Sequence, residues 1–386
     1  MSAAPEIAVP DRFAGLIGQA VAAIDTPALV IDLDAMDRNL HRMADFCLAR
    51  GMRLRPHAKM HKCAELALLQ MAHGAVGVCV QKIGEALALA SKGVGDIYVS
   101  NEVVDPRKLA RLATAVRTGG TRFAIAVDSL VGIQHLAQAL AHAGVSAPGA
   151  IDVFVEIDVG HGRCGMAPGV PAGELARTVV AQPVLRFAGL QAYHGAAQHY
   201  RSADERRATV AAATQAVRAT CDAIEAMGIA VPLVTGAGTG TFIHEAASGV
   251  WGELQAGSYL FMDADYAANQ ADPAAPAFEH ALFVKSQVMS RPQGRAVVDA
   301  GHKSHAIDSG LPRVWLPQGL DFANGGDEHG VLRGAHLPEL GETVWLVPGH
   351  CDPTVNLHDV MVGVRGGLIA GRVERLLPVD ARGALG

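Results

Sequence analysis

Several features that mark other classes of protein are missing from this chain of 386 residues. No CxxC pair occurs, which excludes a zinc knuckle and a thioredoxin motif. The six cysteines are Cys47, Cys63, Cys79, Cys164, Cys221 and Cys351. Without such pairs they are predicted to be mostly reduced thiols in the core of a cytoplasmic protein.

Targeting and membrane signals are missing as well. Met1–Arg12 has no basic segment followed by a long apolar one, so no signal peptide is predicted. No apolar run approaches the ~18 residues that a membrane span requires, so no membrane association is expected. The net charge is -6 and like charges form no block, so the sequence gives no indication of a nucleic-acid partner.

What the chain does have is an alternation of short apolar strands with helical segments. The predicted strands are Met52–Arg55, Val76–Val80, Ile97–Ser100, Arg122–Val127, Val153–Ile157, Phe187–Ala192, Pro232–Thr235 and Glu253–Ser258. This alternation predicts a parallel sheet. Eight units in about 210 residues favour a (β/α)8 TIM barrel near the lower end of its usual size. The absence of GxGxxG at a first strand–helix turn disfavours the alternative, a doubly wound open sheet.

After about Asp272 the helical periodicity of the sequence fades and short strands follow, and this change predicts two domains. Residues 25–272 are assigned to the barrel, except that the strand Pro27–Leu33 would be a ninth and is assigned to the second domain. Residues 273–386, with 1–24 nearby, are predicted to form a smaller β domain with a polar loop at Gly319–Leu337. Its strands are expected at Ala281–Ser290, Arg295–Asp299, Thr343–Val347, Asp359–Val364 and Gly367–Leu376.

A basic turn follows the first barrel strand, with the sequence Arg55-Pro56-His57-Ala58-Lys59-Met60-His61-Lys62. Pro56 favours extended geometry at the residue before it, so Lys59 is predicted to lie just past the strand end, at the barrel mouth. A desolvated lysine among cations forms Schiff bases readily. Its four basic neighbours, Arg55, His57, His61 and Lys62, are therefore expected to lower the pKa of Lys59. The alternative is a basic turn on the surface.

Two glycine-containing stretches follow the seventh and eighth predicted strands. They are Thr235-Gly236-Ala237-Gly238-Thr239-Gly240-Thr241 and Gly257-Ser258-Tyr259. Loops at these positions are the usual phosphate site of a barrel, because backbone N–H groups and hydroxyls can turn toward an anion. The candidate phosphate-binding residues are Thr235, Gly238, Thr239, Gly240, Gly257, Ser258 and Tyr259. The alternative, that glycine and threonine simply make turns, is less favoured for the pair than for either loop alone.

A lysine that faces a phosphate site across a barrel mouth suggests pyridoxal 5'-phosphate. In this interpretation Lys59 forms the Schiff base and the two loops hold the phosphate. Gln81 and Arg163, at other strand ends, are predicted to bond the phenolate oxygen of the cofactor, and Tyr193 to lie near its ring nitrogen.

A second polar signal is Pro348-Gly349-His350-Cys351-Asp352-Pro353-Thr354, at the end of a strand of the β domain. In an extended segment His350 and Asp352 would share a face and could hold one cation, with Cys351 pointing away. An imidazole and a carboxylate suit Mn²⁺, Mg²⁺ or Zn²⁺. On spacing alone, however, a solvated His and Asp are the commoner explanation. His302–His305 and Asp327–Gly330 could be site loops or surface turns.

These motifs resemble the D-threonine aldolase and D-serine dehydratase family, pyridoxal-phosphate enzymes with a fold of the alanine racemase type. The resemblance runs from Thr26-Pro27 to the C-terminal strands. The motifs that carry it are Arg55-Pro56-His57-x-Lys59, Asp158-Val159-Gly160-x-Gly162-Arg163-x-Gly165, Tyr193-His194-Gly195, Gly238-Thr239-Gly240-Thr241 and Pro348 to Thr354. It implies that Lys59 is the Schiff-base lysine, that His350 and Asp352 are metal ligands, and that the protein is a homodimer.

The second metal ligand separates two branches of that family. The dehydratase-like branch carries His-x-Cys, whereas this chain carries His350-x-Asp352, as in D-threonine aldolases that use a hard ion, typically Mn²⁺. The resemblance thus implies an aldehyde-lyase that cleaves D-threonine and related β-hydroxy-D-amino acids to glycine and an aldehyde. A metal-bound water or a histidine such as His194 would be the base. The alternatives are a D-serine or D-threo-3-hydroxyaspartate dehydratase and a non-catalytic carrier of pyridoxal phosphate.

Overall fold

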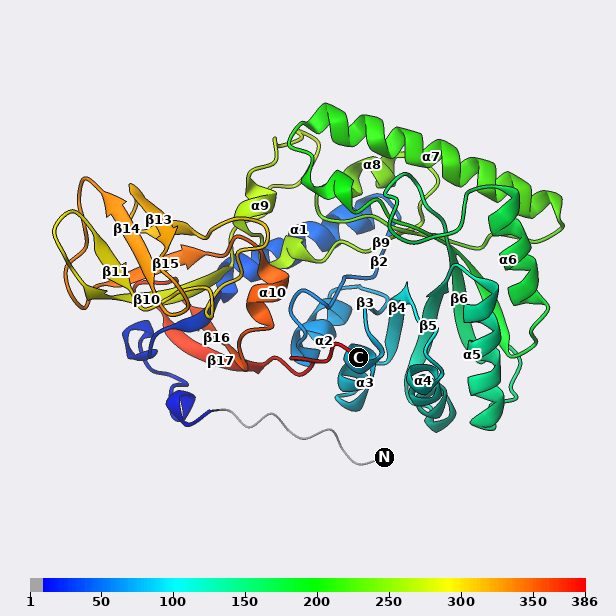
Figure 1. The fold of residues 1–386 in the computed structure, drawn as a ribbon, viewed down its shortest axis with the longest axis horizontal. Coiled ribbons are helices and arrows are strands. Elements are labelled where there is room, and N and C mark those ends of the chain that lie inside the picture. The colour runs from blue at the N-terminus through cyan, green and yellow to red at the C-terminus, as the bar shows by residue number, and fades with distance from the viewer. Residues whose placement is uncertain (1–9) are drawn as a thin grey trace.

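A computed structural model describes residues 10–386, which form two sheets of different kinds that lie side by side (Figure 1). Most of Met1–Arg12, for which no signal peptide was predicted, lies outside the described residues. Residues 10–24 run along the β domain, where the Gly18 N–H donates to the carbonyl oxygen of Val373 at 2.8 Å. No helix within residues 10–386 is both long and apolar enough to cross a bilayer.

The first sheet is parallel, and its strands follow the order β2-β9-β8-β7-β6-β5-β4-β3. The strands are β2 Arg53–Leu54, β3 Val78–Val80, β4 Asp96–Glu102, β5 Arg122–Val127, β6 Ile151–Glu156, β7 Leu185–Ala192, β8 Val234–Gly236 and β9 Glu253–Leu254. The two ends of this order meet beyond β2, because the Cys79 N–H donates to the Pro56 carbonyl and the Ala58 N–H donates to the Cys79 carbonyl, both at 2.8 Å. The predicted (β/α)8 barrel is therefore confirmed.

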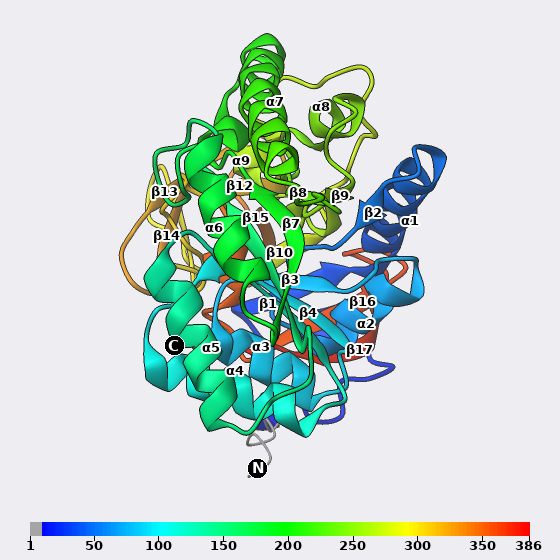
Figure 2. The same ribbon diagram turned by 90° about the vertical axis from the view of Figure 1, so that its right-hand side faces the viewer.

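Helices cover the outside of the barrel, as the view in Figure 2 shows. They are α1 Leu33–Ala49, α2 Ala64–Ala72, α3 Ile83–Ser91, α4 Pro106–Thr118, α5 Leu130–His142, α6 Val170–Val180, α7 Ala203–Ala226 and α8 Phe242–Ala247. Two short helices, α9 Ala264–Ala267 after the last barrel strand and α10 Cys351–Val355 in the second domain, complete the set among the described residues. Local sequence sets their starts: Asp105 accepts the Arg107 N–H before α4, and Ser202 accepts the Glu205 N–H before α7.

The second sheet is mostly antiparallel, in the order β13-β14-β11-β10-β1-β16-β17, and β15 pairs with both β10 and β12. Its strands are β1 Ala28–Asp32, β10 Leu282–Ser290, β11 Ala296–Val298, β12 Arg313–Leu316, β13 Leu320–Asn324, β14 Gly330–Gly334, β15 Thr343–Val347, β16 Val360–Arg365 and β17 Arg372–Pro378. β1 lies between β10 and β16, so the first strand within residues 10–386 is central to the second sheet.

One buried apolar cluster joins the two sheets. Leu29 and Ile31 of β1 belong to it, as do Leu54 of β2 and Phe261 after β9, all at most 4% exposed. α1 leads from β1 into the barrel across this shared core (Figure 1). Because the core is continuous, the C-terminal sheet is held against the mouth of the barrel.

The polar loop predicted at Gly319–Leu337 is wrong. Residues of this stretch form a hairpin, β13 with β14, and β14 also pairs with β11. The hairpin exists because Leu320 and Leu332 are buried in the core that the two sheets share. β17 also starts later than predicted, since Gly366 and Gly367 adopt positive φ in a turn.

The interior of the barrel contains a buried ion pair. Glu253, which is fully buried, accepts from Arg55 Nε at 3.1 Å and from Thr235 Oγ1 at 2.9 Å. Arg55 is 5% exposed and also bonds Asp96. These contacts link β2, β4, β8 and β9 across the barrel.

Removing one partner of this pair leaves a buried charge. Glu253→Ala is expected to lower the free energy of unfolding by about 3 kcal/mol, because the buried Arg55 guanidinium then loses the fully buried one of its two carboxylate partners and keeps only Asp96. Glu279→Ala is the control: Glu279 pairs with Arg38 and Arg42 at the surface, and its loss should cost about 1 kcal/mol or less. Urea denaturation followed by circular dichroism measures both, and equal losses would contradict this account.

Candidate active site

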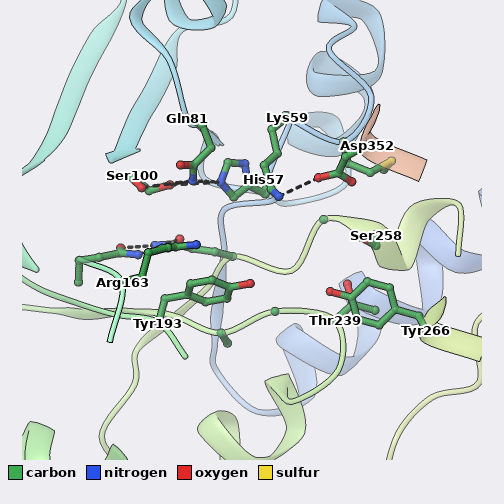
Figure 3. Close-up of a pocket in the computed structure, with 16 residues that line it drawn as sticks. His57, Lys59, Gln81, Ser100, Arg163, Tyr193, Thr239, Ser258, Tyr266 and Asp352 are labelled. Atoms are coloured by element: carbon green, nitrogen blue, oxygen red, sulfur yellow. Dashed lines mark hydrogen bonds and ion pairs between the residues drawn. The ribbon is translucent and has the colours of Figure 1, made fainter. Parts of the chain in front are cut away.

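A cavity of about 180 Å³ lies at the carboxyl ends of the barrel strands (Figure 3). It is lined by His57, Lys59, Met60, Gln81, Ser100, Arg163, Gln191, Tyr193, Ala237, Gly238, Thr239, Gln255, Gly257, Ser258, Tyr266 and Asp352. Nine of the residues predicted to bind the cofactor or the metal are in this set: Lys59, Gln81, Arg163, Tyr193, Gly238, Thr239, Gly257, Ser258 and Asp352. The structure thus brings together residues that are up to 293 positions apart, from 59 to 352.

Lys59 and Asp352 face each other across one wall of the cavity (Figure 3). The Lys59 Nζ lies 2.7 Å from Asp352 Oδ2, although one residue follows β2 of the barrel and the other belongs to α10 of the second domain. The charge of Asp352 raises the pKa of Lys59 above its ordinary value. Burial opposes ionisation of Asp352, but Lys59 and His350 outweigh it and lower the pKa of this carboxyl to about 2.

The expectation that basic neighbours lower the pKa of Lys59 is wrong. Arg55 is neutralised by Glu253 and Asp96, and Lys62 by Glu85 at 2.9 Å. Burial lowers the pKa of His57 well below its usual value and that of His61 to about 4, so both imidazoles are neutral. The Asp352 carboxylate, 2.7 Å from the Lys59 Nζ, has the largest effect, and it raises the pKa of Lys59.

The glycines of the two loops are required by close packing. A Cβ on Gly257 would lie 2.7 Å from the His57 carbonyl oxygen, and one on Gly238 would lie 2.5 Å from Gln198 Oε1. The Tyr259 N–H donates to Thr239 Oγ1 at 3.0 Å and so ties the loop after β9 to the loop after β8. The two loops form one continuous wall of the cavity.

Three residues of the predicted phosphate site do not line this cavity. Thr235 turns into the barrel interior and donates to Glu253. The Tyr259 hydroxyl accepts from Gln70 Nε2 at 3.0 Å in the core. The Gly240 N–H donates to Gln198 Oε1 at 3.0 Å. Their strand-end positions predicted a shared site, but buried hydrogen bonds hold these groups elsewhere.

Arg163 and Tyr193 lie together on the wall opposite Lys59 (Figure 3). The Arg163 guanidinium carbon is 5.5 Å from the centre of the Tyr193 ring. The loop that carries Arg163 is fixed by Asp158, whose carboxylate accepts from the Gly160 and Gly162 N–H groups at 2.9 and 3.0 Å. Burial raises the pKa of the Tyr193 phenol.

Gln81 is held at the cavity wall by His57. The Gln81 Nε2 donates to His57 Nε2 at 2.8 Å, and His57 Nδ1 is buried without a hydrogen-bond partner. The neutral imidazole of His57 lines the cavity beside Lys59 and holds the Gln81 amide at the cavity wall.

His350 and Asp352 lie at the start of α10, with His350 Nε2 3.8 Å from Asp352 Oδ1. His350 Nδ1 contacts Asp308 Oδ2 at 2.7 Å, which orients Nε2 toward Asp352. Asp352 Oδ1 is buried and lacks a hydrogen-bond partner. The predicted extended segment is wrong, because the helix begins at Cys351, but the two side chains still converge. Cys351 points away, with its Sγ 3.5 Å from the Met262 carbonyl oxygen.

Known proteins share both parts of this chain. The family profile described as "Alanine racemase, N-terminal domain" matches residues 31–265, and a serine dehydratase domain matches residues 281–364. This chain belongs to the alanine racemase N-terminal domain family. It is 45% identical over 370 residues to a D-threonine aldolase from Arthrobacter sp., with 95% of each chain covered. It is 44% identical over 377 residues to a 3-hydroxy-D-aspartate aldolase from Paracoccus denitrificans (strain Pd 1222), also with 95% of each covered.

Solved structures of this family agree with the fold. The crystal structure of D-threonine aldolase from Filomicrobium marinum matches with a TM-score of 0.91 and 48% identity, over 96% of this chain and 98% of that one. D-threo-3-hydroxyaspartate dehydratase from Delftia sp. HT23 matches with a TM-score of 0.80 and 26% identity, over 93% and 98%. The likeness to the aldolases is thus closer in both sequence and backbone.

The candidate base His194 lines neither the cavity nor the outer pocket beside it. Its ring stacks on His161 with centroids 5.7 Å apart, its Nδ1 accepts the Ala197 N–H, and burial lowers its pKa. His199 does line the outer pocket of about 260 Å³, together with Lys59, His350 and Asp352. His199 Nδ1 lies 2.5 Å from Asp265 Oδ2, so Nε2 is the ring nitrogen left free.

Sequence reasoning missed His199 and several lining residues, namely Ser100, Gln191, Gln255 and Tyr266. Ser100 and Gln191 lie in β4 and β7, and their inward direction could have been found from strand alternation. Tyr266 comes from α9, a single helical turn without an amphipathic pattern. For His199, the available signal was a second histidine five residues after His194 in the same loop.

Among residues 10–386 no cluster of three or more His, Cys, Asp or Glu side chains is arranged to hold a metal ion. A cation at His350 and Asp352 would therefore have two protein ligands, and its other positions would be filled by water or substrate.

Proposed function

We propose that this protein is a pyridoxal-phosphate-dependent aldolase that cleaves β-hydroxy-D-amino acids, D-threonine among them, to glycine and an aldehyde. The observation that carries the proposal is the approach of Lys59 to Asp352, 2.7 Å apart in one cavity. It sets a candidate Schiff-base lysine beside a candidate cation site. The relatives named as aldolases, at 44% and 45% identity, support the same reaction.

The lining of the cavity fits pyridoxal phosphate. Lys59 would carry the cofactor, and Gly238, Thr239, Gly257 and Ser258 would hold its phosphate. Gln81 and Arg163 would bond its phenolate oxygen, and Tyr193 would lie near its ring nitrogen. The observation that supports this fit is the wall made by Gly238, Thr239, Gly257 and Ser258, because two glycines without side chains and two hydroxyl groups line the same cavity as Lys59. When bound, the cofactor supplies an electron sink for the pair left on Cα as Cα–Cβ breaks.

The His350–Asp352 pair fits a divalent cation. Asp352 Oδ1 has no partner, and Asp308 fixes the tautomer of His350 so that Nε2 can coordinate. One imidazole and one carboxylate suit Mn²⁺, with Mg²⁺ or Zn²⁺ as alternatives. A divalent cation there would lower the pKa of the β-hydroxyl of the substrate and so ease removal of its proton.

His199 takes the proton from that hydroxyl. Its Nδ1 is held by Asp265, and Arg201 bonds the other oxygen of the same carboxylate, so Nε2 faces the outer pocket as an acceptor. One proton leaves the β-oxygen and one is added to Cα, so cleavage to glycine and aldehyde needs no oxidant or reductant. Lys59 Nζ and His350 Nε2 approach different oxygens of Asp352, Oδ2 and Oδ1, so one carboxylate connects the candidate Schiff-base amine with the candidate metal ligand.

The reaction class is tested with purified protein, pyridoxal phosphate and Mn²⁺. D-threonine is expected to give acetaldehyde and glycine, and D-serine little pyruvate, because the ligand pair is His-x-Asp rather than His-x-Cys. Coupled assays for acetaldehyde and pyruvate measure the two products. Pyruvate as the main product would favour the dehydratase, and neither product would favour a non-catalytic carrier.

The metal is tested by chelation and substitution. His350→Ala and Asp352→Asn are expected to lower aldolase activity about a hundredfold or more, because polarisation of an oxygen by a metal is worth several kcal/mol. The absorbance of the bound cofactor should persist in His350→Ala, since His350 does not line the inner cavity. Full activity of His350→Ala in the presence of a chelator would contradict the metal site. Manganese as the resident ion and the homodimer stay predictions.

The base is tested by comparing two neighbouring histidines. His199→Ala is expected to lower kcat about 10² to 10⁴-fold, the usual contribution of a positioned general base. His194→Ala should reduce kcat much less, because its ring faces neither pocket. Steady-state kinetics over a pH series measures both, and a larger loss for His194→Ala would return the role to His194.

A further inference from the structure

One buried carboxylate links the turn that carries Lys59 to the loop that carries Gln81. Glu85 of α3 is 3% exposed, and its Oε1 lies 2.9 Å from the Lys62 Nζ. Its Oε2 accepts the Gln81 N–H at 2.8 Å and the Lys82 N–H at 3.1 Å. A single side chain therefore contacts the chain three residues after Lys59 and at Gln81 itself.

Lys62 is held in a conformation that non-glycine residues rarely adopt. Its φ is 53°, in the left-handed region, and its side chain is nearly fully buried. Its N–H donates to the Ala58 carbonyl at 2.7 Å, and its carbonyl accepts the Ala381 N–H at 3.0 Å. Such backbone strain persists only where surrounding contacts hold it, and the ion pair with Glu85 is one of them.

Strain of this kind is concentrated at the site. Within residues 10–386 the non-glycine residues with positive φ are Lys62, Ala237 and Met262. Ala237 lines the cavity, in the loop after β8. Met262 precedes Asp263, which accepts the N–H of Cys351 at 3.0 Å beside the candidate cation ligands. The Lys62 turn is thus one of three fixed loops around the cavity.

We propose that Glu85 is a positioning residue, which fixes Lys59 and Gln81 relative to each other through Lys62 and two backbone N–H groups. The inference rests on the proposed function, because both positioned residues are assigned there to the cofactor. A simple helix cap would explain the contacts with Gln81 and Lys82. It would not explain why the same carboxylate pairs with a buried ammonium from another turn.

The substitution Glu85→Gln separates these two roles. Glutamine keeps an oxygen that can accept a backbone N–H, but it leaves the Lys62 ammonium buried without a counter-charge. The turn must then shift to solvate this charge, and Lys59 shifts with it. A cofactor bound through Lys59 and Gln81 together should bind less tightly.

The experiment titrates cofactor-free protein with pyridoxal phosphate and follows the Schiff-base absorbance. Glu85→Gln is expected to raise the dissociation constant of the cofactor about tenfold or more. Loss of a residue that holds a metal-binding side chain in place lowers metal affinity by a similar factor. Asp152→Asn is the matched control. Asp152 is also 3% exposed and pairs with Arg122 and Arg186, near the amino end of β6. The Asp152→Asn substitution should lower the melting temperature but leave the dissociation constant of pyridoxal phosphate unchanged.

The double variant Lys62→Met/Glu85→Gln removes both buried charges and keeps the test valid if the single variant folds poorly. Its melting temperature is expected to recover while its affinity for the cofactor stays low, because the ion pair between residues 62 and 85 is still absent. Wild-type affinity in Glu85→Gln, or affinity that recovers together with stability in the double variant, would overturn the inference. A wild-type protein that forms no Schiff base would overturn the proposed function as well.

Discussion

The contact between Lys59 and Asp352 depends on both halves of the molecule. One residue is supplied by a turn after the first barrel strand, the other by a helix of the C-terminal sheet domain. The Asp352 side chain is only 14% exposed, so its carboxylate is poorly accommodated without a partner of opposite sign, and the half-exposed Lys59 ammonium supplies one. The pair therefore marks the point at which the two domains make one site.

The fold keeps this point in place through its first strand. β1 is hydrogen-bonded between β10 and β16, and α1 then carries the chain into the barrel. The apolar core shared by the sheets includes residues from β1, β2 and the segment after β9. A change in the orientation of the second domain would disturb this core, so the candidate cation ligands are held at the barrel mouth by packing rather than by a flexible loop.

Much of this arrangement could be predicted from the sequence, because it depends on local signals. Strand–helix alternation gave the barrel, and the strand ends gave Lys59 and the glycine loops. The hairpin β13–β14 was missed since its strands are stabilised by distant partners such as β11. The pKa of Lys59 was predicted in the wrong direction because sequence proximity does not reveal which charges are paired. Arg55 and Lys62 are neutralised by Glu253 and Glu85, which come from other elements.

The proposed reaction depends above all on attachment of the cofactor to the amine of Lys59 in this cavity. Incubation with pyridoxal phosphate, reduction with borohydride and peptide mass spectrometry test it directly, because reduction makes a Schiff base permanent. One pyridoxyl group per chain is expected, on the peptide that contains Lys59. Labelling of other lysines with Lys59 left unmodified would contradict it.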